Sequence, residues 1–261
     1  MTIRVGIGGW TYEPWRGTFY PEGHPQKREL EYASAHVTVI EINGTFYSRQ
    51  KPKTWADWAS RVPDDFVFAL KASRYCVTRR VLAEAGESIG TFFAQGLSEL
   101  GPKLGPILWQ FAATRAFDAD DVARFLDLLP EDVDGLPLRH VVEPRHESFR
   151  HPRFIALARE RGVAIVVADD DTHPQIADVT ADFVYARLQD QREAEPTGYP
   201  PAELDRWANV ARGWADGGEP EGLDYVERGR AKTTPRDVFV FMINGAKVRA
   251  PAAAMALLER S

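Results

Sequence analysis

Short apolar segments with alternating side chains recur along the chain, and segments with helical spacing lie between them. In Val37–Asn43, for example, side chains alternate between two faces, so Glu41 and Asn43 share the face of the valines. A buried strand therefore ends in a carboxylate and an amide that point the same way. This repeated pattern constrains the fold more than any other feature of the sequence.

About eight segments are expected to be β-strands, because each is short, apolar and rich in β-branched or aromatic residues. They are Ile3–Gly8, Val37–Asn43, Phe66–Lys71, Gly105–Gln110, Arg139–Arg145, Val163–Asp169, Phe183–Arg187 and Asp237–Asn244. Helices are expected at Lys27–His36, Pro52–Arg61, Val81–Leu100, Ala119–Leu129, Pro152–Arg161, Pro201–Asp216 and Pro251–Glu259. The helix Val81–Leu100 contains two candidate break points, Gly86 and Gly90, and Asp118 is a candidate N-cap for the helix that follows it.

Alternating strands and helices favour a parallel sheet with crossover helices, and the number of strands predicts a single (β/α)8 TIM barrel of the α/β class. An open doubly wound sheet is the alternative. Such a sheet usually has a glycine-rich phosphate turn after its first strand, and Gly6, Gly8 and Gly9 match that turn only weakly. We expect one domain over residues 1–261, with a charged surface loop at 217–236.

Composition limits the classes of function. The chain has 44% hydrophobic and 27% charged residues and a net charge of -6, which is typical of a globular protein without a basic field for nucleic acid or anionic membranes. A single cysteine, Cys76, excludes an intramolecular disulfide and a cysteine-built metal site. No export leader or long apolar span is evident, so a cytoplasmic location without membrane contact is expected.

Polar side chains end the expected strands on the face that we interpret as the barrel interior. Catalytic groups of TIM barrels lie at these C-terminal strand ends, so the set predicts a ligand pocket. Purely structural ion pairs that close the barrel are the alternative. The residues are Glu41, Asn43, Lys71, Gln110, Glu143, Arg145, Asp169, Arg187 and Asn244.

Three of these residues are candidate catalytic groups. Lys71 is predicted to act as an imine-forming amine, a proton donor or a cation for an anionic substrate, and a salt bridge to a glutamate is the structural alternative. Glu41 and Glu143 are predicted to be the general acid and base, since two carboxylates in unlike surroundings can hold different protonation states. The structural alternative is that each glutamate only pairs with a neighbouring cation.

Other residues are assigned to substrate binding. Arg145 and Arg187 are suited to bidentate binding of a phosphate or carboxylate. Six aromatic residues are candidates for stacking on a sugar or base, although packing within a loop is the more common role of such residues. They are Trp10, Tyr12, Trp15, Phe46, Tyr47 and Tyr75, of which Tyr12, Phe46 and Tyr47 are assigned to the site. Three cations among the carboxylates disfavour a divalent metal, and no cofactor is expected.

Linked motifs along nearly the whole chain resemble one known family. They are GGWTYEPWRGTFYP (Gly8–Pro21), VIEINGTFY (Val39–Tyr47), FVFALKASRYCVT (Phe66–Thr78), GPILWQF (Gly105–Phe111), VEPRHESF (Val142–Phe149), TADFVYARL (Thr180–Leu188) and the strand end at Asn244. In this order they resemble the domain of unknown function 72, or YecE-like, family. The resemblance implies a TIM barrel with no settled biochemical activity.

The chain departs from the family pattern at several positions. The family usually has Thr-Ser where Ile7 and Gly8 stand, His where Arg79 stands, His-Gly where Gln189 and Asp190 stand, and Asn-Asn where Ile243 and Asn244 stand. The loss of two histidines disfavours a mechanism in which imidazole shuttles the proton. The substrate is therefore expected to differ in detail.

Three functions are compatible with the sequence. The favoured one is a metal-independent hydrolase, lyase or isomerase that acts on a small anionic or sugar-containing substrate. The alternative is a binding protein for a nucleotide or nucleic acid, and a metal-dependent phosphodiesterase is a weaker third. The sequence does not indicate an oligomeric state.

Overall fold

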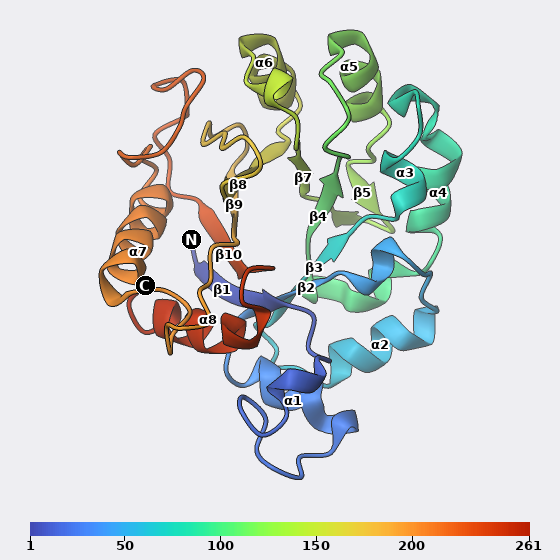
Figure 1. Ribbon diagram of the computed structural model, residues 1–261. Helices are drawn as coiled ribbons and strands as arrows, with labels where there is room; N and C mark the ends of the chain where they lie inside the picture. Colours follow the sequence, from blue (N-terminus) through green and yellow to red (C-terminus); the bar gives the residue numbers. More distant parts are fainter.

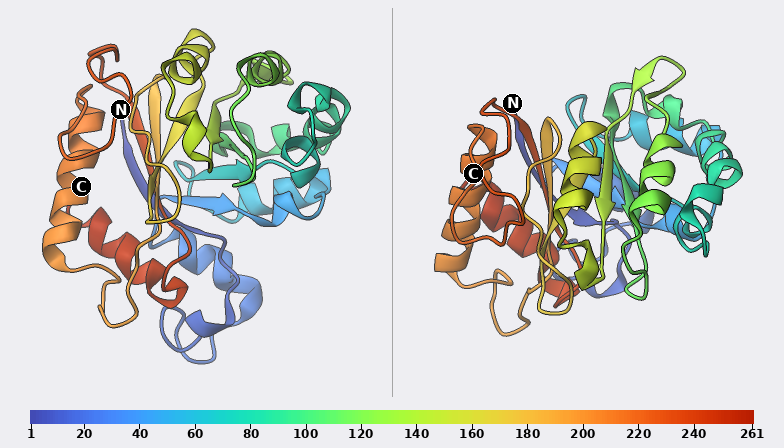
Figure 2. Two further views of the ribbon diagram at one scale, coloured as in Figure 1. Left: turned by 45° about the horizontal axis from the view of Figure 1, so that its top comes forward. Right: turned by 90° about the horizontal axis from the view of Figure 1, so that it is seen from above.

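The computed structural model describes residues 1–261 as a closed barrel of parallel strands surrounded by helices (Figures 1 and 2). Around the barrel the order is β1, β2, β3, β4, β7, β8, β9 and β10, and β10 pairs again with β1. The predicted TIM barrel is thereby confirmed. The strands are β1 (Ile3–Gly8), β2 (Val39–Ile42), β3 (Val67–Lys71), β4 (Leu104–Gln110), β7 (His140–Glu143), β8 (Ala164–Asp169), β9 (Phe183–Leu188) and β10 (Asp237–Met242).

Helices follow most strands and cover the outside of the barrel (Figure 2). The α-helices are α1 (Glu29–Ser34), α2 (Pro52–Ser60), α3 (Arg74–Val77), α4 (Gly86–Phe93), α5 (Ala119–Asp127), α6 (Pro152–Glu160), α7 (Pro201–Ala215) and α8 (Ala250–Leu258). Short 3-10 helices are η1 (Glu13–Trp15), η2 (Gln26–Arg28), η3 (Gly44–Phe46), η4 (Leu82–Glu84), η5 (Leu97–Lys103), η6 (Glu147–Phe149) and η7 (Lys247–Arg249). The connection between β8 and β9 contains no helix, and no helix of the structure could span a membrane.

Local signals explain several boundaries. Asp118 caps α5 as predicted, because its Oδ1 accepts hydrogen bonds of 3.0 Å from the amides of Asp120 and Asp121. The helix expected at Val81–Leu100 is divided into η4, α4 and η5. Gly96 precedes η5 with a φ of 83°, a left-handed conformation that ends regular helix. A small hairpin of β5 (Asp132–Val133) and β6 (Leu136–Pro137) was not predicted.

The segment 217–236 connects α7 with β10 and contains no helix or strand. Leu223 and Arg236 of this segment are buried. The Asp178 carboxylate accepts backbone hydrogen bonds of 2.7 Å from Val226 and Glu227. These contacts hold parts of the segment against the body of the barrel.

Two apolar layers make up the core. A small cluster fills the barrel interior and includes Val39, Val67, Ala69, Leu108 and Val141. A larger cluster lies between the strands and the helices. For five strands, the residues predicted from alternation to face the barrel interior do so: β2, β3, β4, β7 and β9. The polar side chains at the ends of these strands therefore point inward, as expected.

The predicted phase is wrong for β8 and β10. Ala164 and Val166 of β8, with Phe239 and Phe241 of β10, face the interior, whereas the residues predicted to do so pack outward. Both strands are apolar on both faces, so alternation alone does not distinguish inside from outside.

Glycine on β1 allows the backbone of the neighbouring strand β2 to approach closely. Gly6 of β1 is paired with Phe241, and a Cβ on Gly6 would lie only 1.7 Å from the Val39 carbonyl oxygen. The Phe241 ring stacks on Tyr185 of β9 with centroids 4.7 Å apart. Large rings from β9 and β10 thus pack against each other in the barrel interior.

Candidate functional site

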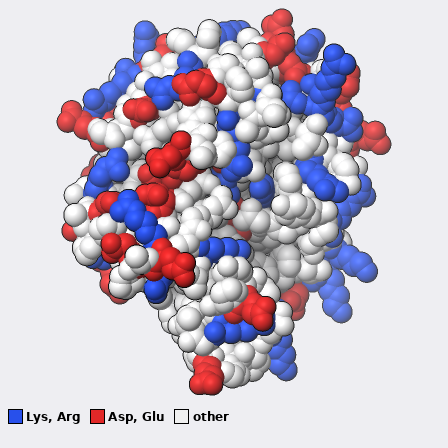
Figure 3. All heavy atoms as spheres, in the orientation of Figure 1, with Lys and Arg blue, Asp and Glu red and all other residues white.

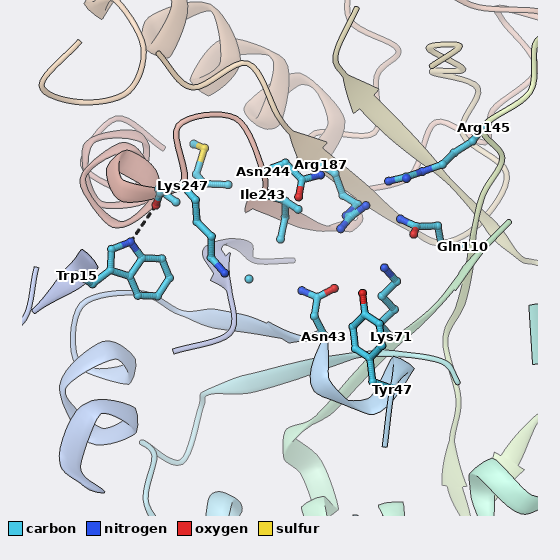
Figure 4. Close-up of a pocket in the computed structure, with 13 residues that line it drawn as sticks. Trp15, Asn43, Tyr47, Lys71, Gln110, Arg145, Arg187, Ile243, Asn244 and Lys247 are labelled. Atoms are coloured by element: carbon cyan, nitrogen blue, oxygen red, sulfur yellow. Dashed lines mark hydrogen bonds between the residues drawn. The ribbon is translucent and has the colours of Figure 1, made fainter. Parts of the chain in front are cut away.

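A pocket of about 350 Å³ opens at the C-terminal ends of the strands (Figure 4). Seven of the residues assigned to the site from sequence line it: Asn43, Tyr47, Lys71, Gln110, Arg145, Arg187 and Asn244. They come from six different strand ends or the turns that follow them. The parallel strands thus bring together side chains that are up to about 200 residues apart, as expected for a TIM barrel.

Arg187 is the centre of a buried ion network beneath the pocket. Its Nη2 donates to Glu41 Oε1 at 3.1 Å, its Nε to Glu41 Oε2 at 3.2 Å, and its Nη1 to Glu143 Oε2 at 2.7 Å. All three side chains are at most 2% exposed. One guanidinium therefore joins two carboxylates that approach it from β2 and β7.

The carboxylate oxygens of Glu41 and Glu143 also accept hydrogen bonds from other side chains. Tyr185 Oη donates to Glu41 Oε2 at 2.6 Å, and Gln110 Nε2 donates to Glu143 Oε2 at 2.6 Å. Arg145 Nη2 donates to Glu143 Oε1 at 3.0 Å. Every oxygen of Glu41 and Glu143 accepts at least one hydrogen bond, and neither glutamate lines the pocket.

Electrostatics favour the ionised network. Burial by itself would raise the pKa of Glu143, but the Arg187 and Arg145 guanidiniums outweigh burial and the pKa is lowered. Burial opposes the charge of Arg187, and the two glutamates outweigh it and raise its pKa. Burial first, and then the Glu41 charge, raise the pKa of Tyr185 well above its usual range. Glu143 is thus held as an anion at neutral pH.

Lys71 has a different environment. Its Nζ lies 4.4 Å from the centroid of the Phe46 ring and makes no hydrogen bond or ion pair with another side chain. Burial, followed by the positive charge of Arg187, lowers the pKa of Lys71 to about 8. The salt bridge that was the structural alternative for this lysine is not formed. A largely buried amine faces the pocket without a carboxylate partner.

Amide side chains line other parts of the wall. Asn244 lies just past β10 with a φ of 61°, a left-handed conformation that asparagine tolerates better than most residues. Its Nδ2 donates to Gln189 Oε1 at 2.6 Å. Asn43 lies between Lys71 and Lys247 in the view of Figure 4. These groups offer neutral hydrogen-bonding partners between the cations.

The assignment of Asp169 to the pocket is wrong. Asp169 belongs to the outward phase of β8, where its Oδ2 accepts a hydrogen bond of 3.1 Å from Tyr199 Oη. Burial raises the pKa of Asp169 to about 6. It lines a separate polar depression beside Asp170 and His173. The cause is that β8 is apolar on both faces, so its inward and outward residues cannot be told apart from sequence. Every residue of β8 predicted to point inward is therefore next to one that does.

Tyr12 and Phe46 also do not line the pocket. Each ring supports a lysine instead: Phe46 lies under Lys71, and Tyr12 lies 4.5 Å from Lys247 Nζ. Both aromatic residues pack within loops at the rim, Tyr12 edge-on against Trp15 and Phe46 edge-on against Tyr47. They shape the site through the cations that they contact.

Sequence reasoning did not identify Lys247 as a site residue. Lys247 begins η7, three residues after Asn244, and its carbonyl oxygen accepts a hydrogen bond of 2.9 Å from Trp15 Nε1 (Figure 4). Burial lowers the pKa of Lys247. The only hint in the sequence was a basic residue shortly after the last strand. A turn has no regular alternation of side chains, so the direction of the Lys247 side chain could not be predicted.

Two departures from the family pattern lie in the pocket wall. Gly8 ends β1, and a Cβ added to it would lie 2.7 Å from Ile243 Cδ1. The absence of a side chain at Gly8 therefore leaves the space that Ile243 occupies. Arg79 lies elsewhere, with Nη2 donating to Ser88 Oγ at 2.8 Å. The structure contains no group of three or more His, Cys, Asp or Glu residues placed to hold a metal ion.

Charges of both signs are spread over the surface, and lysine or arginine atoms border the hollow near the middle of the face in Figure 3. Inside the pocket, Arg145 and Arg187 are compensated by Glu41 and Glu143. Lys71 and Lys247 add two positive charges without a paired carboxylate. The pocket is thus cationic although the whole chain carries a net charge of -6.

Comparisons with known proteins agree with this architecture. The chain is similar over 99% of its length to a DUF72 family protein from Thermotoga maritima MSB8, with a TM-score of 0.73, 21% identity and 97% of that chain covered. It is similar over 99% to a DUF72 family protein from Enterococcus faecalis V583, with a TM-score of 0.70, 19% identity and 96% of that chain covered. At these identities the likeness shows the fold alone.

Sequence comparisons identify the family. A stretch of 70 residues, 27% of this chain, is 27% identical to UPF0759 protein YunF of Bacillus subtilis (strain 168) and spans only 24% of that protein. The family model described as "Protein of unknown function DUF72" matches residues 4–261. The resemblance inferred from the motifs is therefore confirmed, and the chain belongs to the DUF72 family.

Proposed function

We propose that this chain is an enzyme that acts on a small anionic substrate and that Lys71 supplies the reactive amine. One observation carries the proposal: a mostly buried lysine faces the pocket over an aromatic ring and has no carboxylate partner. Such a site lowers the amine pKa and increases the neutral fraction near neutral pH, which is the form that reacts as a nucleophile.

The arginines are suited to hold the anionic group of the substrate. Arg145 and Arg187 both line the pocket, and each is fixed by at least one buried carboxylate. Guanidinium groups held in this way lose little further conformational freedom when they bind a carboxylate or phosphate. We therefore assign Glu41 and Glu143 to positioning the arginines. Their predicted acid and base roles are the alternative assignment.

The chemistry that best suits Lys71 is addition to a carbonyl carbon. The neutral amine forms a C–N bond, the carbonyl π electrons move to oxygen, and proton transfer from nitrogen to oxygen gives a carbinolamine. Loss of water then gives an imine, in which the former carbonyl carbon is doubly bonded to Nζ. An imine activates the neighbouring carbon for lyase or isomerase reactions, so a small anionic aldehyde or ketone is the proposed substrate class.

Reductive trapping tests this proposal. The wild type is incubated with single carbonyl compounds, such as pyruvate, 2-oxoglutarate and glyceraldehyde 3-phosphate, in the presence of cyanoborohydride, and adducts are located by peptide mass spectrometry. We expect one of the compounds to label Lys71 selectively. Lys71→Arg keeps the positive charge and should abolish that adduct, whereas Lys53→Arg on the exposed start of α2 should not change it. Equal labelling of Lys71 and exposed lysines would contradict the proposal.

A binding protein without catalytic activity remains the alternative from sequence. It would use the same cations and the rim aromatics, such as Tyr47 and Trp15, for a nucleotide or nucleic-acid end. Binding of a nucleic acid would weaken steeply with salt, since it releases counterions. An adduct or turnover at constant salt that depends on Lys71 would favour the enzyme.

A further inference from the structure

The two unpaired lysines of the pocket come from distant parts of the barrel. Lys71 ends β3, whereas Lys247 begins η7 after β10, and β1 and β2 lie between these strands in the barrel. Figure 4 shows Lys247 on one side of the pocket, Lys71 with Arg145 and Gln110 on the other, and Asn43 between them. The positive charge is therefore divided between two ends.

Both ammonium groups are held by aromatic rings rather than by carboxylates. Lys71 Nζ lies 4.4 Å from the centroid of the Phe46 ring, and Lys247 Nζ lies 4.5 Å from Tyr12 and 5.7 Å from Trp15. A cation over a ring face keeps its N–H groups available for another acceptor. The indole of Trp15, which is fully buried, also holds the backbone of Lys247 through its carbonyl oxygen.

The charge balance differs from that of a site for one anionic group. The two pocket arginines are neutralised by two buried glutamates, so the excess charge is one lysine at each end. A ligand with a single anionic group would leave one of these partly desolvated lysines without a counterion. Two separate anionic groups would satisfy both.

We propose that Lys247 forms a second anion subsite and that the ligand of this pocket carries two anionic groups, one at each end. The group near Lys71 is bound with Arg145 and Arg187, and the other is bound by Lys247. The ligand is thus a dicarboxylate or a carboxylate with a phosphate or phosphonate group. This inference deepens the proposed function by naming the substrate class, and its test needs no covalent step.

Calorimetric titrations at low ionic strength test the inference with defined probes. Succinate, glutarate and adipate are compared with butyrate and valerate, and sulfate serves as a compact dianion. We expect one dicarboxylate to bind at least about tenfold tighter than the monocarboxylates and sulfate, because only it reaches both subsites. A parallel titration with 3-phosphonopropionate shows whether one end prefers a phosphonate over a carboxylate.

Variants locate the second subsite. Lys247→Met should reduce the affinity for the best dicarboxylate to that for a monocarboxylate, and it should change monocarboxylate binding by no more than about twofold, since the other end remains. Lys247→Arg should retain the dicarboxylate advantage. Lys53→Met removes an exposed lysine outside the pocket and should leave all affinities unchanged.

Two results would overturn the inference: no dicarboxylate advantage in the wild type, or an advantage that persists in Lys247→Met. The comparison of dicarboxylate with monocarboxylate affinity in the wild type tests the inference even if a variant does not fold. A dicarboxylate advantage without any trapped adduct would reject the imine chemistry and keep the two-anion pocket. A trapped adduct without a dicarboxylate advantage would support the imine chemistry and reject the two-anion pocket.

Discussion

Lys71 and Arg187 lie at the C-terminal ends of different strands, β3 and β9, on the same side of the barrel. They illustrate how side-chain chemistry decides the role of a buried cation. Arg187 satisfies two carboxylates with its planar guanidinium and stays charged, whereas Lys71 lies over a ring and has its pKa lowered to about 8. An arginine would not supply a neutral amine at this position. Of these two residues, Lys71 is thus the one that burial can convert to a neutral, reactive amine.

Replacement of Lys71 by methionine should stabilise the protein at pH 7, by on the order of 1–3 kcal/mol, because the wild type buries a partly desolvated charge there. The pKa of Lys71 is about 8 in the folded chain, against 10.5 for an ordinary lysine. Between these values the unfolded chain binds more protons, so the wild type gains stability as the pH rises.

The stabilisation by Lys71→Met is therefore expected to be largest below pH 8 and to shrink towards pH 10.5. Urea unfolding at several pH values measures it, with Lys53→Met as the exposed control. A variant that is less stable than the wild type at pH 7 would show that the ammonium group of Lys71 contributes to folding instead.

At the scale of the element, a polar residue at the end of a strand made the site predictable. Glu41, Lys71 and Arg187 each end an apolar run, and their inward direction follows from the alternation that precedes them. On β8 and β10 both faces are apolar, so alternation did not distinguish inside from outside and the polar end of β8, Asp169, was placed on the wrong face. Barrel closure, which sets these phases, depends on contacts between distant strands.

Glycine on β1 is the element-scale feature that the alternation did not predict. A Cβ on Gly6 would lie 1.7 Å from a backbone oxygen of β2, which cannot move without breaking the sheet. Gly6→Ala should therefore destabilise the fold by about 3 kcal/mol or more.

Gly90→Ala provides the matched control for Gly6→Ala. Gly90 is exposed in α4 with nothing within 4 Å of an added Cβ, so alanine there should stabilise the helix by about 0.5–1 kcal/mol. Thermal unfolding of both variants measures the difference. A Gly6→Ala variant as stable as Gly90→Ala would contradict the close approach of β1 and β2.

At the scale of the molecule, the charged network of Arg187 ties together strands on different sides of the barrel. It joins β9 to β2 and β7, and Gln110 extends it to β4. The apolar interior below and the pocket above are separated by this layer. The same residues therefore contribute to barrel closure and to the electrostatics of the pocket.

Arg187→Met should destabilise the protein by about 3–5 kcal/mol, because it leaves two buried carboxylates without their cation. Further replacement of both glutamates by glutamine should recover part of this loss. Arg192, which pairs with Asp190 and Glu203 at the surface, is the control, and Arg192→Met should have a much smaller effect. Equal losses for both arginines, measured by urea unfolding, would argue against a special role for the network.

The central claim is that Lys71 is a reactive amine in a pocket built for anions. Its titration can be followed by NMR in protein labelled with 13C at lysine Cε, with Lys71→Arg used to assign the signal. The free protein should give a pKa of about 8 for Lys71, and a saturating dicarboxylate should raise it, because a bound anion favours the ammonium form. A pKa near 10.5 that no bound anion changes would contradict the account.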